Sequence, residues 1–518
     1  MKTLTIMVIA IGLYLLGMIG IGVWTSRKNK NTDDFFLGGR KLGPIVTAMS
    51  AEASDMSSWL LMGLPGVAML SGLAEASWTA IGLAIGTYLN WLIVAKRLRV
   101  YTQRIGAITI PEYFSKRYGD DKNILSIIAA VIIIVFFIPY TASGFAACGK
   151  LFSSVLNVDY LTAMIICAVI IAVYCVLGGF LAASTTDLIQ SIVMTLALVI
   201  VIGFGETAVT ANTGAFGFDG ILNAVKDLPG YLSLTHSYDA ATGTATSYGT
   251  VTIVGLLAWG LGYFGMPHIL LRFMAIKDAS KIKTSRRIAS VWVVISMGVA
   301  VMIGVAGLSL ANHGVIPMLE GSNTETVIIE IAKAIGKYGY ILALIAGVIL
   351  AGILAATMST ADSQLITASS SVTKDIAQNF LHIKMSDKMS MIIARATVII
   401  ISLIAVVFAA DPNSSVFRIV QFAWAGFGAT FAPVVLASLF WKRSNKWGAL
   451  AGMLAGGITV FVWKYGISKL GGVFAVYELL PAFIVACIAL VVVSLLTSKP
   501  SEKVMKEYDE AKAASKEK

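Results

Sequence analysis

The sequence predicts an all-α membrane protein with about thirteen transmembrane helices. Hydrophobic residues make up 57% of its 518 residues and charged residues only 13%, whereas a soluble domain carries about 25% charged residues. Apolar runs recur along the whole chain, and roughly 20 such residues are enough to cross a bilayer as a helix. We expect spans near residues 4–25, 42–71, 76–97, 123–150, 157–179, 186–209, 249–274, 286–312, 339–370, 390–410, 416–440, 447–467 and 474–497.

The distribution of positive charge predicts the orientation of the chain. Most of the 39 Lys and Arg residues fall in alternate loops and in the C-terminal tail. Cytoplasmic loops are enriched in Lys and Arg, so we expect the N-terminus outside and the C-terminus inside. This distribution also accounts for the net charge of +11 without a nucleic-acid ligand. We expect a multi-pass protein of the bacterial cell membrane, surrounded by lipid, with no obligatory protein partner.

The second predicted span holds polar groups where a bilayer disfavours them. The stretch Ser50–Gly66 contains Glu52, Asp55 and several serines between apolar ends. An Asp at the centre of a membrane helix costs about 2.5–3.5 kcal/mol on the lenient insertion scales. A bound cation and a small polar solute would offset that cost.

The seventh predicted span is interrupted as well. Three glycines and a proline fall within eight residues between Gly260 and Pro267, and both residue types weaken a helix. Two interrupted spans at corresponding positions are typical of an inverted-repeat transporter. We therefore expect one transmembrane domain over residues 1–498, with spans 2–6 (42–209) and 7–11 (249–440) as five-helix repeats, followed by a short charged cytoplasmic tail at 499–518.

Two polar clusters are candidates for a cation site. Unwinding at Ala53–Met56 would free backbone carbonyls, which are tolerated in lipid only when buried in protein or lining a cavity. In the ninth span, Ser359 and Thr360 precede Asp362 and Ser363 by about one turn. The simpler alternatives are that the acidic residues pair with Arg or Lys, and that the hydroxyls bond to their own helix.

Aromatic residues lie beside the interruptions. Trp59, Tyr140, Trp259 and Tyr263 are each close to a break or a proline. Such residues either face lipid as interfacial belts or form the wall of a solute site. The sequence leaves these two alternatives open.

Several motifs together resemble one known family. The match covers nearly the whole chain, to about residue 500, and the motifs appear in the same order and spacing. They closely resemble the sodium/proline symporters of the sodium:solute symporter family. The motifs are Ser54–Ser57 with Trp59–Gly66, Gly178–Leu181 with Asp187, Trp259–Ile269, Met358–Thr360 and Ala423–Gly428.

This resemblance implies a LeuT-like core and sodium-coupled import of L-proline by alternating access. It implies no enzymatic activity and no cofactor, with Na+ as the coupling ion. The implied roles are Na+ binding by Ala53, Met56, Ala356, Ser359 and Thr360, sodium coupling by Asp55 and Ser57, and proline binding by Trp59, Tyr140, Trp259, Tyr263 and Pro267.

The sequence departs from the family pattern at a few positions. Glu52 and Ser58 stand where proline symporters carry glycine, and Asp362 stands where a small or hydroxyl residue is expected. We hypothesise a second cation site, for Na+ or H+, formed by Asp187, Ser359, Asp362 and Ser363. The resemblance does not explain Glu52.

Other functions remain as alternatives. A sodium- or proton-coupled symporter of another amino acid, a carboxylate or a vitamin fits the same pattern. A solute sensor usually needs a longer cytoplasmic domain than the tail provides. An enzyme is the least supported class, because the four His residues are scattered and no nucleophile–base pattern is present.

Overall fold

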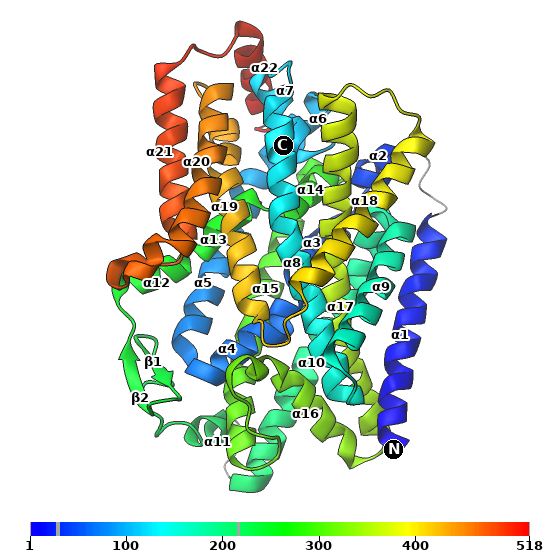
Figure 1. The fold of residues 1–518 in the computed structure, drawn as a ribbon, viewed down its shortest axis with the longest axis vertical. Helices are drawn as coiled ribbons and strands as arrows, with labels where there is room; N and C mark the ends of the chain where they lie inside the picture. Colours follow the sequence, from blue (N-terminus) through cyan, green and yellow to red (C-terminus); the bar gives the residue numbers. More distant parts are fainter. Residues whose placement is uncertain (1, 27–31, 215–217, 517–518) are drawn as a thin grey trace.

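The computed structural model describes residues 2–26, 32–214 and 218–516, and these residues are mostly helical (Figure 1). Eleven helical segments among them are long and apolar enough to cross a membrane. They comprise α1 (Lys2–Ser26), α5 to α6 (Leu73–Leu89, then η3 Asn90–Val94, then Ala95–Arg104), α8 (Ile124–Leu156), α9 (Tyr160–Gly178), α10 (Phe180–Thr213), α15 (Ile282–Asn312), α17 with η8 (Tyr340–Ser370 and Ser371–Phe380), α18 (Asp387–Phe408), α19 (Val416–Phe440), α20 (Lys446–Tyr465) and α21 (Leu479–Leu496).

The two remaining predicted spans are the two broken helices. Residues 250–275 form α12 (Thr250–Leu257), α13 (Trp259–Gly262), η4 (Tyr263–Gly265) and α14 (Pro267–Ala275), with a bend of 46° between the halves. This bent pair makes a twelfth candidate span. The segment predicted at 42–71 forms α3 (Pro44–Asp55), the π-helical turn η2 (Trp59–Gly63) and α4 (Leu64–Ser71). All thirteen predicted segments are therefore helical.

The described chain ends lie at opposite ends of the molecule (Figure 1), as an odd number of crossings requires. The central helix α17 packs against α1, α3, α8, α9, α10 and α18. With α19 it is the most buried of the candidate spans. α20 and α21 pack on α19. The broken helix α3–α4 thus packs against continuous helices, with α10 and α17 beside α3 and α15 beside both halves.

Short elements cover the two ends of the bundle (Figure 1). At the end that holds the N-terminus lie α11 (Phe218–Asn223), the antiparallel hairpin of β1 (His236–Asp239) and β2 (Thr244–Ser247), and α16 (Val327–Ile335) after η6 (Gly321–Thr326). At the opposite end lie α2 (Thr32–Leu37), α7 (Ile110–Tyr118) and α22 (Glu502–Ala514). The other short 3-10 turns are η1 (Gly38–Arg40), η5 (Ala279–Lys281), η7 (Gly336–Tyr338), η9 (Ile467–Leu470) and η10 (Gly472–Ala475).

Glycines bring α13 into backbone contact with α5. A Cβ atom on Gly260 would lie 2.2 Å from the Gly82 carbonyl oxygen, and one on Gly86 would lie 2.3 Å from the Gly260 carbonyl oxygen. Small residues permit this close approach between membrane helices. The second broken helix is therefore held against the third span by its backbone.

Candidate functional site

The first broken helix unwinds just after Asp55. Its last regular residue is Asp55, and Met56 has φ −76° and ψ 63°, outside the helical region. The Ser57 amide donates to the Asp55 carbonyl over 2.8 Å, so it does not bond to Ala53 as a continuing helix requires. The Ser57 hydroxyl accepts the Trp59 amide at 3.1 Å. The irregular segment is thus Met56–Ser57, slightly later than the predicted unwinding at Ala53–Met56.

The Ala53 carbonyl receives hydroxyl groups from α17 in place of its lost helical donor. Ser359 Oγ donates to Ala53 O over 2.7 Å, and Thr360 Oγ1 lies 3.5 Å from the same oxygen. Ser359 Oγ is also 3.1 Å from the Ala356 carbonyl. Four of the five residues predicted to bind sodium therefore meet at one point, and the fifth, Met56, lies at the break.

Asp55 joins the two broken helices. Its Oδ2 atom accepts the Tyr263 hydroxyl at 2.5 Å, and its carbonyl accepts the Tyr140 hydroxyl at 3.3 Å. Asp55 is 5% exposed. The side chain and the carbonyl of Asp55 thus accept tyrosine hydroxyls among the described residues, in contrast to the Arg or Lys pairing that the sequence left open.

The predicted aromatic wall forms one buried cluster on the other side of Asp55. The ring centroids of Trp59 and Trp259 are 5.5 Å apart, and Phe417 lies 5.7 Å from the first and 5.6 Å from the second. Tyr263 is 5.1 Å from Trp424. The indole nitrogens of Trp59 and Trp259 are buried and have no hydrogen-bond partner within the described part of the chain.

Tyr140 and Pro267, the other two residues predicted to bind proline, are not part of the aromatic cluster around Trp59 and Trp259. Tyr140 reaches the site from α8 through its hydroxyl. Pro267 is the first residue of α14 and follows Met266, whose backbone is extended. Proline is tolerated at a helix start because its missing N–H has no helical partner there. Pro267 therefore defines the second break.

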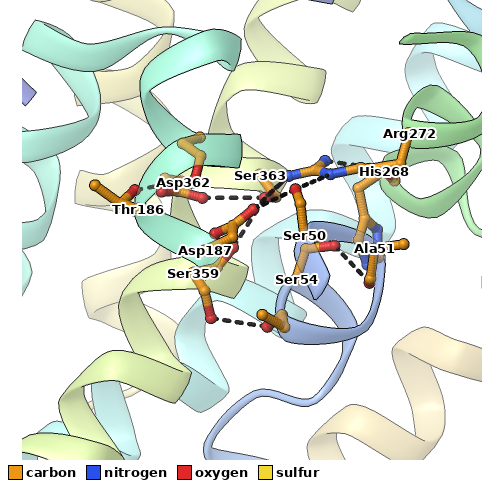
Figure 2. A network of polar contacts seen from close by, with 12 residues as sticks. Ser50, Ala51, Ser54, Thr186, Asp187, His268, Arg272, Ser359, Asp362 and Ser363 are labelled. Atoms are coloured by element: carbon orange, nitrogen blue, oxygen red, sulfur yellow. Dashed lines mark hydrogen bonds and ion pairs between the residues drawn. The ribbon is translucent and has the colours of Figure 1, made fainter. Parts of the chain in front are cut away.

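A buried polar network lies next to the Ala53 cluster (Figure 2). Asp187 Oδ2 accepts the Ser50 hydroxyl at 2.6 Å and an Arg272 terminal nitrogen at 3.2 Å. Arg272 also donates to the hydroxyls of Ser50 and Ser363. The Ser363 hydroxyl lies 3.0 Å from Asp362 Oδ1. The residues of the predicted second cation site are brought together, and they share the space with a guanidinium.

Glu52 belongs to neither cluster. It is 1% exposed, and its Oε1 atom accepts the Trp91 indole N–H at 2.9 Å. Trp91 lies in η3 of the third span and packs on Phe273 with ring centroids 4.4 Å apart. Glu52 therefore links the first broken helix to the third span.

A second buried ion pair holds the start of α19. Glu325 accepts the Lys150 ammonium at 2.8 Å, the Ser415 hydroxyl at 2.7 Å, and the amides of Val416 and Phe417 at 3.0 Å each. A carboxylate is stabilised at a helix N-terminus by its free amides and dipole. This cap fixes Phe417, whose ring contacts both tryptophans of the aromatic cluster.

A model of the sodium:solute symporter family matches residues 35–456 of the chain. The chain belongs to this family. Among relatives of this sodium:solute symporter, the sodium/proline symporter of Haemophilus influenzae is 43% identical over 516 residues, which is 98% of this chain and 97% of that protein. The osmoregulated proline transporter OpuE of Bacillus subtilis is 40% identical over 497 residues, 96% of each protein.

A solved structure supports the fold of this symporter. The Na+-coupled sialic acid symporter in its substrate-bound outward-open state matches with a TM-score of 0.76 at 20% identity. The match covers 96% of this chain and 99% of that one. The predicted LeuT-like membrane fold is thereby confirmed, whereas the boundaries of its two repeats stay a prediction.

Sequence reasoning missed several residues that the symporter places around the site. Neither Arg272 nor Lys150 was among the predicted site residues. A basic residue close to an interrupted helix was the available signal for Arg272. The aromatic neighbours Phe417, Trp424 and Tyr477, whose ring centroids lie within 6.0 Å of that of Trp259, carried no spacing that tied them to the breaks.

Removing the Glu325 carboxylate should destabilise the folded symporter. Glu325→Ala leaves the buried Lys150 ammonium unpaired, which costs about 3–5 kcal/mol. The matched control is Glu330→Ala, because Glu330 pairs with the more exposed Lys333, and exposed pairs contribute about 0–1 kcal/mol. Thermal unfolding of the purified proteins should show a clear loss for the first variant only. Equal midpoints would contradict the structural role of the buried pair.

Proposed function

We propose that this protein imports L-proline together with Na+ across the bacterial cell membrane. The main support is the agreement between full-length relatives named as proline transporters and a site that combines an oxygen cluster with an aromatic wall. Its helical spans and family make it a multi-pass membrane transporter. No step of this function requires a cofactor beyond Na+ as the coupling ion.

We assign the sodium site to Ala53, Met56, Ala356, Ser359 and Thr360. The support is that the Ser359 and Thr360 hydroxyls of α17 lie 2.7 and 3.5 Å from the Ala53 carbonyl oxygen of α3. Unwound backbone carbonyls coordinate Na+ in transporters with broken helices. A cation between them would tie the broken helix to the continuous α17.

We place the proline between the aromatic cluster and the two breaks. Trp59 and Trp259 supply apolar surface for a pyrrolidine ring, and their unpaired indole N–H groups suit a carboxylate. Tyr140, Tyr263 and Pro267 border the same region. A buried donor without a partner costs about 1–3 kcal/mol, so a solute that accepts these hydrogen bonds gains affinity.

We propose that Asp55 and Ser57 couple ion and solute. Asp55 contacts Tyr263 on the solute side and directly follows the segment that presents Ala53. Ser57 holds the unwound segment through the Trp59 amide. Ordering of this segment by Na+ would position Trp59, which is the sequence of events that alternating access requires.

The energetics of this scheme are sufficient for accumulation. One Na+ entering with a net-neutral amino acid moves one charge, worth about 2.3 kcal/mol per 100 mV. Since 1.4 kcal/mol is a factor of ten, this corresponds to roughly forty- to fifty-fold accumulation. Any sodium gradient adds to that value.

Uptake of labelled proline into proteoliposomes tests the proposed function. We expect accumulation when an inward Na+ gradient or an inside-negative potential with Na+ is imposed. A pH gradient alone should drive none. Unlabelled amino acids, carboxylates and vitamins serve as competitors that would reveal a different solute. Uptake driven by protons and indifferent to Na+ would overturn the proposal.

Loss of the Ser359 hydroxyl should weaken sodium binding. Ser359→Ala removes one ligand, so we expect the Na+ concentration for half-maximal proline uptake to rise at least about tenfold, the equivalent of 1.4 kcal/mol. Ser369→Ala on the same helix is the control, since among the described residues its hydroxyl bonds only to the Ile366 carbonyl of its own helix. An unchanged Na+ dependence in Ser359→Ala would remove this residue from the ion site.

We further propose a second cation site at Asp187, Ser359, Asp362 and Ser363. The support is a charge balance: two buried carboxylates share one guanidinium, that of Arg272. In addition, Asp187 Oδ1 and Asp362 Oδ2 have no hydrogen-bond partner among the described residues. The network with both carboxylates ionised therefore lacks one positive charge, which Na+ or H+ would supply.

Charge stoichiometry tests the second site. If the site is coupled to transport, wild-type protein should move two charges per proline, and Asp362→Asn should move one. Simultaneous measurement of labelled proline uptake and transported charge gives this ratio. A ratio of one in both proteins would exclude a coupled second cation.

A further inference from the structure

The C-terminal helix α22 bridges two distant parts of the end of the bundle opposite the N-terminus, which the distribution of Lys and Arg predicts to be the inner end. It packs on α6 and α7, with Val504, Tyr508 and Ala511 as its buried face. Glu510 forms an ion pair with Arg104 at the end of the third span, and Asp509 forms one with Lys442 in the turn between α19 and α20. The helix thus connects the inner ends of the third and eleventh spans.

Beneath α22 lies a buried guanidinium without a carboxylate partner. Arg117 of α7 is fully buried, and only its Nε atom has a hydrogen-bond partner within the described residues, the Ser438 carbonyl at 2.8 Å. Its guanidinium carbon lies 4.9 Å from the ring centroids of Tyr118 and Tyr508 and 5.7 Å from that of Tyr101. Three aromatic rings thus hold the charge by cation–π attraction.

Tyr508 is the part of this cage that the tail contributes. It is 3% exposed, and its hydroxyl donates to the Leu439 carbonyl at 3.3 Å. The two ion pairs beside it involve side chains that are about half exposed, and such pairs contribute little. The attachment of α22 therefore depends chiefly on its buried face, in which Tyr508 is the largest side chain.

The Arg117 cage makes this attachment readily reversible. Departure of α22 exposes the apolar face of the helix, which is unfavourable. It also lets water reach the Arg117 guanidinium, which relieves the desolvation of an unpaired charge. Because these two effects oppose each other, undocking of α22 costs less than the burial of Tyr508 alone suggests.

We propose that α22 is a clasp that keeps the inner side of the transporter closed and is released when that side opens. The spans that it connects lie in different predicted repeats, which move against one another in alternating access. The clasp rests on the proposed transport function, because only a transporter needs an inner side that opens and closes. The clasp consists of Tyr508, Asp509 and Glu510, with their partners on α6, α7 and α19–α20.

Hydrogen exchange of the purified full-length protein in lipid nanodiscs tests the clasp. We expect Tyr508→Ala to speed amide exchange about tenfold in residues 95–118 and 440–446, and we expect no change in the β1–β2 hairpin or α16. The matched control is Lys512→Ala, an exposed position of the same helix. Single changes at Arg104 or Glu510 should alter exchange only slightly, because this half-exposed ion pair contributes little to the attachment of α22.

Two outcomes would overturn the clasp. One is unchanged inner-side exchange in Tyr508→Ala, and the other is an increase spread evenly over both ends, which indicates a general loss of stability. Proline uptake is measured separately on the same protein. If uptake fails while the local exchange effect appears, the proposed substrate is wrong and the clasp stands. If uptake succeeds while exchange is unaffected, the clasp alone is wrong.

Discussion

The structure depends on how the unwound backbone of Met56–Ser57 is satisfied inside a membrane protein. Lipid offers no hydrogen-bond partners, so a broken helix is tolerated only where neighbouring protein supplies them. The Ser57 hydroxyl, the Tyr140 hydroxyl and the hydroxyls of α17 all serve this purpose. The same oxygens are the groups that suit a cation, so the solution to a folding problem also supplies the ligands of the proposed ion site.

Two buried ion pairs in the described chain each connect two different elements of the fold. Asp187 and Arg272 connect α10 to α14, and Lys150 and Glu325 connect α8 to the turn before α16. Buried pairs add little net stability compared with apolar packing, but breaking one is costly. Such pairs therefore specify which helices are neighbours. This specification adds to side-chain packing where two of the helices are interrupted.

The sequence identified the membrane class, all thirteen helical segments and most of the residues that the structure brings together at the candidate site, because each leaves a local signal. Apolar length marks a span, and carboxylates or glycines inside a span mark a break. It located the unwound residues imperfectly, because Ser57 and contacts with α17 decide where α3 ends. It did not reveal the burial of Lys150, since α8 is 33 residues long and hydropathy does not show which part of a long helix is covered by neighbours. The partner of Glu52, Trp91, lies in another span and has no sequence signature.

Helix α17 connects the polar cluster at the Ala53 carbonyl with the polar network around Arg272. Ser359 contacts the Ala53 carbonyl, and Ser363 lies one turn later beside Arg272 and Asp362. The Ser363 hydroxyl is also 2.8 Å from the Ser359 carbonyl. Any shift of Ser359 toward a cation therefore acts on the Arg272 network through a single helical turn. Arg272 lies in α14, the part of the second broken helix that follows its break. Ion binding at the first break can therefore influence the second without a long chain of intermediates.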